Sequence, residues 1–105
     1  MELEVITDND TLLIRRLRLA PGEPMFWHSD ACRRFTVVVA GSKLAIEYRD
    51  SSEQVAVDVH PGMAGWDEPD DRTHRAINRG GEAYEEVVTF YKASPDVIPQ
   101  PGCPA

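Results

Sequence analysis

The chain has 105 residues, 18 of them acidic and 11 basic, which gives a net charge of −7. A chain of this length forms one domain with one core, so any functional site lies inside that domain or at its mouth. The negative charge disfavours nucleic acid and anionic membranes as partners and leaves small molecules or proteins.

The N-terminal residues lack the basic and apolar regions of a secretory signal, and no apolar run is long enough to span a bilayer. We therefore expect a cytoplasmic protein. The two cysteines, Cys32 and Cys103, do not have a paired spacing, so we expect reduced thiols.

Short runs rich in β-branched and aromatic residues alternate with turn signals along the chain. This spacing predicts an antiparallel all-β sandwich or barrel. The expected strands are 3–7, 11–19, 25–28, 35–40, 43–49, 54–60, 64–68, 74–78 and 83–92. The fifth and sixth alternate at period two and are joined by "DSSE", which predicts a hairpin.

The chain divides by composition near residue 92. Residues 1–92 carry all the strand signals and are expected to form the β-barrel domain. Residues 93–105 contain four prolines, which lack the backbone donor that a sheet needs. We expect this segment to be an extended or disordered tail.

Two polar segments carry the histidines of interest. In the first, Gly22 is followed after five residues by His28, then by Asp30 and Arg34, and a glycine closes the segment at position 41. The second runs from Pro69 to Asn78 and has His74 between them.

These two segments resemble the two motifs of the cupin superfamily, the RmlC-like jelly rolls. The resemblance covers residues 11–92 and implies a double-stranded β-helix, with a metal site built from two histidines and a glutamate of the first motif and a histidine of the second. His28 and His74 match two of those ligands. Asp30 stands where the second histidine is expected and Arg34 where the glutamate is expected, so the first metal motif is degenerate.

The residues themselves allow two interpretations of this site, with and without a metal ion. Positions 28 and 30 of an extended segment point to one face, and His74 arrives from another strand. Two imidazoles and one carboxylate suit non-haem iron(II), with zinc, manganese and nickel as alternatives. The order His-x-Asp followed by a distant His also resembles the 2-oxoglutarate oxygenases. In the competing interpretation, Arg34 fills the vacated metal site through a salt bridge with Asp30, because a guanidinium cannot act as a ligand.

Other side chains have candidate roles beside the metal site. Arg34 could hold the carboxylate or phosphate of a substrate. Trp27 and Trp66 could wall a substrate pocket or belong to the core. Asn78 could orient His74 or a neighbouring backbone group. Glu68 could replace the missing ligand or lie in a solvated turn.

Three functions follow from these residues. The first is a metal-dependent small-molecule enzyme, dioxygenase-like if the ion is iron. The second is a non-catalytic module that binds a small, anionic molecule, with Arg34 and Asp30 in place of the metal. The third is a metal-free isomerase with His74 as its general base. The cupin resemblance also implies a homodimer, and the apolar run at 35–39, "FTVVV", favours a strand that is covered on both faces.

Overall fold

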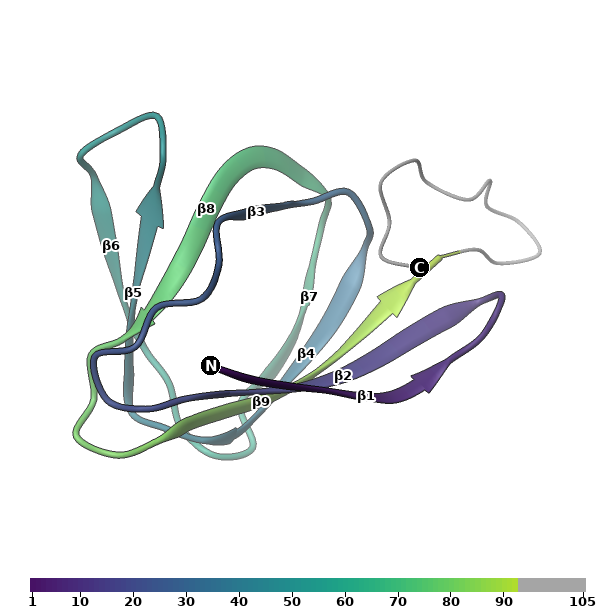
Figure 1. Cartoon of the computed structure of the whole chain (residues 1–105), viewed down its shortest axis with the longest axis horizontal. Coiled ribbons are helices and arrows are strands. Elements are labelled where there is room, and N and C mark those ends of the chain that lie inside the picture. Colours follow the sequence, from purple (N-terminus) through teal and green to yellow (C-terminus); the bar gives the residue numbers. More distant parts are fainter. Residues whose placement is uncertain (93–105) are drawn as a thin grey trace.

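The computed structural model describes residues 1–92. All regular secondary structure in these residues is β-strand. The tail expected at 93–105 lies outside the described residues. The strands, labelled in Figure 1, are β1 (Glu2–Asp8), β2 (Leu12–Leu19), β3 (His28–Asp30), β4 (Arg34–Ala40), β5 (Lys43–Tyr48), β6 (Gln54–Asp58), β7 (Ala64–Asp67), β8 (Asp70–Asn78) and β9 (Tyr84–Tyr91).

The strands form two antiparallel sheets that face each other. One has the order β1-β2-β9-β4-β7 and the other the order β3-β8-β5-β6. The chain crosses repeatedly from one sheet to the other, so that strands distant in sequence, such as β4 and β9, become neighbours. Figure 1 shows the two sheets wrapped around a common interior. This arrangement confirms the predicted all-β jelly roll.

The expected strands are found, with two differences near the candidate site. The hairpin of β5 and β6 is confirmed. The third strand lies at His28–Asp30 rather than at 25–28, and β8 begins at Asp70 rather than at residue 74. Both differences have one cause, because His28 pairs with His74 and Asp30 pairs with Asp70. The polar segments become strand through pairing with each other, which their local composition does not show.

The closing glycine of the first motif, Gly41, lies in the turn between β4 and β5 with a φ of 129°. An added Cβ would lie 2.7 Å from Cδ1 of Tyr84. Both the backbone conformation and the contact require glycine, which lets β4 turn closely over the buried Tyr84 ring.

The inner face of the five-stranded sheet follows the period-two pattern of its strands. On β2 the residues Leu13, Leu17 and Leu19 are buried, and on β9 the residues Tyr84, Val88 and Phe90 are buried. Most of the buried apolar residues fall into two separate clusters, one around Leu17 and Tyr84 and one around Leu13 and Phe90. The space between the sheets is therefore not filled by a single apolar core.

Cys32 belongs to the second cluster and is 1% exposed. It is disulfide-bonded, so the expectation of a reduced thiol is wrong for this residue. No helix long and apolar enough to span a membrane occurs among residues 1–92.

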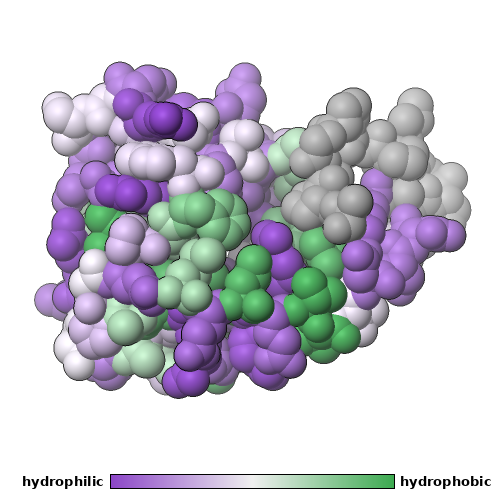
Figure 2. All heavy atoms as spheres, viewed as in Figure 1, coloured by the Kyte–Doolittle hydropathy of each residue, from purple (hydrophilic) through white to green (hydrophobic). Residues whose placement is uncertain are grey.

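The edge strand β1 carries hydrophobic side chains that remain exposed. Leu3, Val5 and Ile6 are 44%, 57% and 44% exposed. Figure 2 shows hydrophobic residues at the surface in the region where Figure 1 draws β1 and the N-terminus. One edge of the larger sheet is thus both unpaired within the described chain and apolar.

Candidate metal and ligand site

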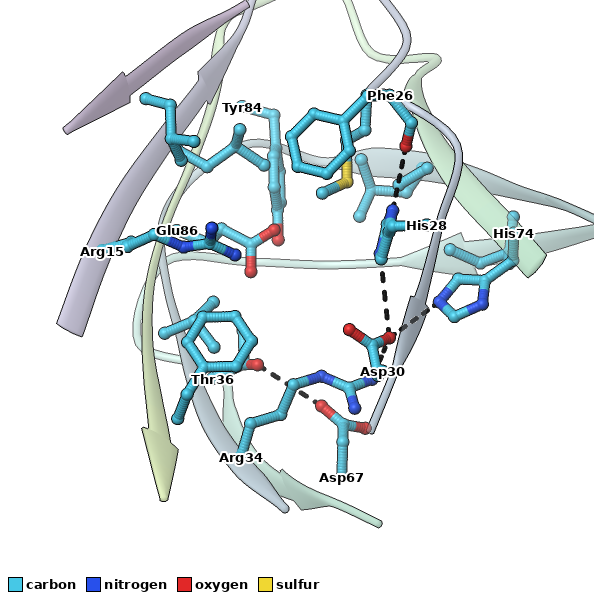
Figure 3. A pocket seen from close by; sticks show the side chains of 18 residues that line it. Arg15, Phe26, His28, Asp30, Arg34, Thr36, Asp67, His74, Tyr84 and Glu86 are labelled. Carbon is cyan, nitrogen blue, oxygen red and sulfur yellow. Dashed lines mark hydrogen bonds and ion pairs between the residues drawn. The ribbon is translucent and has the colours of Figure 1, made fainter. Parts of the chain in front are cut away.

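A cavity of about 230 Å³ lies between the two sheets and is lined by residues of both apolar clusters. The side of the four-stranded sheet contributes His28, Asp30 and His74. The five-stranded sheet contributes Arg15, Arg34, Thr36, Asp67, Tyr84 and Glu86 (Figure 3). The cavity therefore has an unusually polar lining for the interior of so small a domain.

The three predicted ligands converge at the cavity wall. Pairing of β3 with β8 places His28 opposite His74, and Asp30 follows on the same strand across a register shift. Asp30 Oδ2 lies 2.9 Å from His74 Nε2 and 3.7 Å from His28 Nε2. One ligand atom from each residue lies within 4.8 Å of the others, so the three can surround one ion.

Hydrogen bonds to the backbone fix the orientation of both imidazoles. His28 Nδ1 lies 2.9 Å from the carbonyl oxygen of Phe26, and His74 Nδ1 lies 2.7 Å from that of Arg72. A carbonyl only accepts, so each Nδ1 carries a proton and donates it. In the neutral rings each Nε2 then has a free lone pair, which is the tautomer that metal-binding histidines adopt.

The buried carboxylate of Asp30 lacks hydrogen bonds at its inner oxygen. Asp30 is 8% exposed, and Oδ2 is buried without a hydrogen-bond partner although His74 Nε2 is only 2.9 Å away. The contact is close in distance, but it does not have hydrogen-bond geometry. Lone pairs of nitrogen and oxygen that face each other repel, so this position calls for a proton or a cation.

Arg34 points into the cavity and supplies one such cation. Its Nη2 lies 3.1 Å from Asp30 Oδ2, and its side chain is 17% exposed. Its Nη1 is buried without a hydrogen-bond partner. The competing interpretation, a salt bridge between Arg34 and Asp30, therefore describes a contact that the structure contains.

The donor set fits a divalent ion in ligand type, tautomer and convergence. Ligand atoms that share one ion lie about 3 Å apart, close to the separations around Asp30 Oδ2. Arg34 competes for the same oxygen, because its guanidinium offers Asp30 a counter-charge without an ion. The His-Asp-His group could hold a metal ion, and its chemistry does not select one metal over another.

Arg15 and Glu86 are among the charged residues of the cavity that the sequence predictions missed. Glu86 is 9% exposed, and burial raises its pKa to about 7, although Arg34 favours the charged form. Burial lowers the pKa of Arg15, and Asp30 and Glu86 oppose this effect. The sequence contained a signal for both residues, because Arg15 in "LLIRRLRL" and Glu86 in "YEEVVTFY" each interrupt the apolar face of an alternating strand.

The two tryptophans, for which a place in the pocket wall was one of two expectations, are not among the residues that line this cavity. Trp27 stacks under the guanidinium of Arg75, 4.2 Å from the ring centroid. Trp66 is 49% exposed and packs against Phe35 on the outer side of the larger sheet. Each precedes a residue that faces the cavity, His28 or Asp67, so alternation turns it outward.

Glu68 and Asn78 also lie away from the three ligands. Glu68 forms an ion pair with Arg33 on the surface, with 3.0 Å between Arg33 Nε and its Oε1. Asn78 is fully buried and donates from Nδ2 to the carbonyl oxygens of Leu19 and Glu82. It therefore holds backbone groups at the far end of β8, which is one of its two predicted roles.

Comparison with solved structures identifies the fold. A cupin domain from Bordetella pertussis Tohama I superposes with a TM-score of 0.77 at 22% identity, over 88% of this chain and 93% of that chain. An RmlC-like cupin family protein with a double-stranded β-helix fold from Methanocaldococcus jannaschii superposes with a TM-score of 0.68 at 16% identity, over 86% of this chain and 78% of that chain. An RmlC-like cupin from Shewanella frigidimarina superposes with a TM-score of 0.60 at 16% identity, over 91% of this chain and 79% of that chain.

No family model matches the sequence, and no curated protein matches it either. The likeness to solved structures therefore carries the assignment together with the strand order. The chain has the fold of a small RmlC-like cupin, a single-domain double-stranded β-helix.

Proposed function

We propose that the cavity binds a divalent metal ion through His28, Asp30 and His74 and a small anionic molecule through Arg34, as in a metal-dependent small-molecule enzyme. One observation carries the proposal. Two imidazoles, each with Nδ1 bonded to a backbone carbonyl, aim Nε2 at a buried carboxylate oxygen that has no hydrogen bond. A bound ion would satisfy all three atoms and would polarise an oxygen-bearing ligand at its open positions.

The charges in the cavity favour an anionic ligand together with the ion. A divalent ion with Arg15 and Arg34 would bring four positive charges, and Asp30 and Asp67 would balance two of them, with Glu86 only partly ionised near neutral pH. A small anion beside Arg34 would reduce the excess, and the buried Nη1 offers it a free donor. We therefore expect metal and anion to bind more tightly together than either binds alone.

A second function is favoured by the contact between Arg34 and Asp30. With 3.1 Å between Nη2 and Oδ2, the pair neutralises the carboxylate without an ion. The cavity would then belong to a non-catalytic module that binds a small molecule. In that case added metal changes neither the thermal stability nor ligand binding.

Metal analysis separates the two functions. Protein purified without chelators is loaded with Fe²⁺ or Mn²⁺ and analysed for bound metal and for a shift in melting temperature. We expect wild type to retain about one equivalent and to melt at a higher temperature with metal, because only the folded chain brings the ligands together. The variant His74→Ala should lose both effects.

The matched control is His60→Ala, because His60 is exposed and lies outside the cavity. This variant should behave like wild type. Retention of less than about a tenth of an equivalent by wild type and by both variants would contradict the metal site and favour the non-catalytic module.

We also propose that the protein is a homodimer. The support is an exposed apolar area on the outer side of the larger sheet, where Trp66 and Val39 are 49% and 44% exposed. The guanidinium of Arg33 lies 4.0 Å from the centroid of the Trp66 ring, so the area has a charged border, as protein interfaces with a polar rim do. A cytoplasmic location and the exclusion of nucleic acid and membrane as partners stay predictions from the sequence.

A further inference from the structure

A second group of polar side chains lies on the wall of the five-stranded sheet. Strand pairing sets Glu86 opposite Leu17 of β2 and Val38 of β4. Arg15 and Thr36 are opposite Val88, two residues further along β9, so both are diagonal neighbours of Glu86 on the inner face. Figure 3 shows the side chains of Arg15 and Glu86 reaching into the cavity from this wall, which also carries Thr36 and Arg34.

This wall contains hydrogen-bonding capacity that the protein does not use. Arg15 Nε and Arg34 Nη1 are both buried without a partner. Buried guanidinium donors are costly to leave unpaired, because the nitrogen has lost its water. Two such atoms on the lining of one cavity indicate that a bound molecule supplies their acceptors.

We propose that this wall binds the carboxylate of a small organic acid, with Arg15 and Arg34 as donors and the carboxyl group of Glu86 beside it. The proposal names the ligand class for the proposed function and rests on it in treating the cavity as a small-molecule site. It does not require the ion. A carboxylate accepts several donors at once and carries the negative charge that two guanidiniums favour.

The dimensions of the cavity limit the acid. Its volume of about 230 Å³ is below the range typical of drug-sized ligands. The lining also includes apolar residues, among them Leu17, Leu44 and Ala76, which belong to one apolar cluster. An acid with a short hydrocarbon tail would place the tail there and its carboxylate at the arginines.

Glu86 links binding to proton uptake. The burial that raises its pKa to about 7 leaves it partly protonated near neutral pH. A ligand carboxylate beside it would disfavour its charged form further, so Glu86 would take one proton from solvent when the ligand binds above neutral pH. The charged and titratable groups around it are Arg15 on β2, Arg34 on β4, Tyr84 on β9, Asp67 on β7 and Asp30 on β3.

The test uses butyrate as the probe and butyramide as its neutral counterpart, on the full chain without metal. Binding is followed by amide chemical shifts in two-dimensional NMR from about pH 6 to about pH 8.5. We expect butyrate to bind and butyramide to bind at least about tenfold more weakly. Above about pH 7.5 the Kd of butyrate should rise about tenfold per pH unit, because one proton is taken up with each ligand.

Two variants assign these effects to residues. Glu86→Gln keeps a donor beside the ligand and cannot titrate, so it should bind butyrate with a smaller dependence on pH. Arg15→Gln should weaken butyrate binding at least about tenfold. Its matched control is Arg16→Gln, because Arg16 pairs with Glu4 on the outer face and should leave the Kd unchanged.

Three outcomes would overturn the proposal. They are the absence of butyrate binding, equal binding of butyramide, and an unchanged pH dependence in Glu86→Gln, which would assign the proton to His28 or His74 instead. Mn²⁺ binding, measured on separate samples of the same proteins, keeps the two proposals apart. A protein that binds Mn²⁺ at His28, Asp30 and His74 but no butyrate contradicts only the carboxylate site.

Discussion

Asp30 is the residue on which the polar interior depends. One of its oxygens lies within 3.7 Å of His28, within 2.9 Å of His74 and within 3.1 Å of Arg34. All of these partners are largely buried, so the carboxylate is the local counter-charge for whatever positive charge they hold. Changing it affects both the candidate metal site and the salt bridge.

Asp30→Ala should lower the free energy of unfolding by roughly 3 kcal/mol, because it leaves Arg34 buried without its nearest counter-charge. The double variant Asp30→Ala, Arg34→Met should recover most of that loss, since no charge is then left unpaired. Urea denaturation of wild type, both single variants and the double variant measures the coupling. Additive losses would show that the pair is not coupled.

Glu86 predicts a pH-dependent stability. Its pKa rises from 4.5 in the unfolded chain to about 7 in the folded one, so the folded state holds the proton longer. Stability from this group is fully present below about pH 4.5 and is lost as pH rises through about 7. The difference in free energy of unfolding between Glu86→Gln and wild type should therefore shift in favour of the variant by on the order of 2–3 kcal/mol between pH 4.5 and pH 8.

The measurement is urea denaturation of both proteins at several pH values across that range. The neighbouring variant Glu85→Gln is the control, because Glu85 forms its ion pairs with Arg16 and Arg18 on the outer face. The same difference between wild type and variant at all pH values would contradict a raised pKa for Glu86.

At the scale of elements, β8 ties the candidate site to the barrel. It pairs with β3 through His74 and with β5 along most of its length. At its other end Asn78 bonds the carbonyl oxygens of Leu19 and Glu82 and accepts from the amide of Gly80. These contacts fix the end of the strand whose beginning carries a ligand.

Asn78→Ala should lower the free energy of unfolding by about 3 kcal/mol, because it leaves buried backbone groups without partners. Asn9→Ala is the matched control. Asn9 accepts from Thr11 and Leu12 in an exposed turn, so its loss should cost about 1 kcal/mol or less. Thermal or urea unfolding measures both, and equal losses would contradict the role given to Asn78.

For the whole molecule, two exposed apolar regions lie on the larger sheet. One is the outer face around Trp66, where Phe35, Tyr91 and the guanidinium of Arg33 lie against the indole ring. The other is the edge strand β1 with Val5. An isologous dimer needs one continuous patch, and the aromatic face offers larger side chains than the edge.

Trp66→Glu should convert the proposed homodimer to a monomer, because it places a charge in the centre of the apolar face. Val5→Glu, on β1, should leave the dimer intact. Size-exclusion chromatography with light scattering gives the mass of each. A monomeric wild type would contradict the dimer, and a monomer produced only by Val5→Glu would place the interface at β1.

The positions of most strands followed from the sequence, because alternation at period two is a local property that strands 2, 5, 6 and 9 display clearly. The motif spacing also brought His28, Asp30 and His74 together correctly, and alternation could have turned Trp27 and Trp66 outward. Arg15 and Glu86 could have been found as charges on otherwise apolar strand faces.

The tertiary structure decided the rest. A period of two says which residues share a face, but only the packing of one sheet on the other makes a face the inside of the cavity. It turned Arg34 toward Asp30 and paired the polar segments as β3 and β8. It also placed the carboxyl of Glu86 on the wall that carries two unpaired guanidinium nitrogens. This arrangement depends on the pairing of β9 with β2 and β4, which lie far from it in the chain.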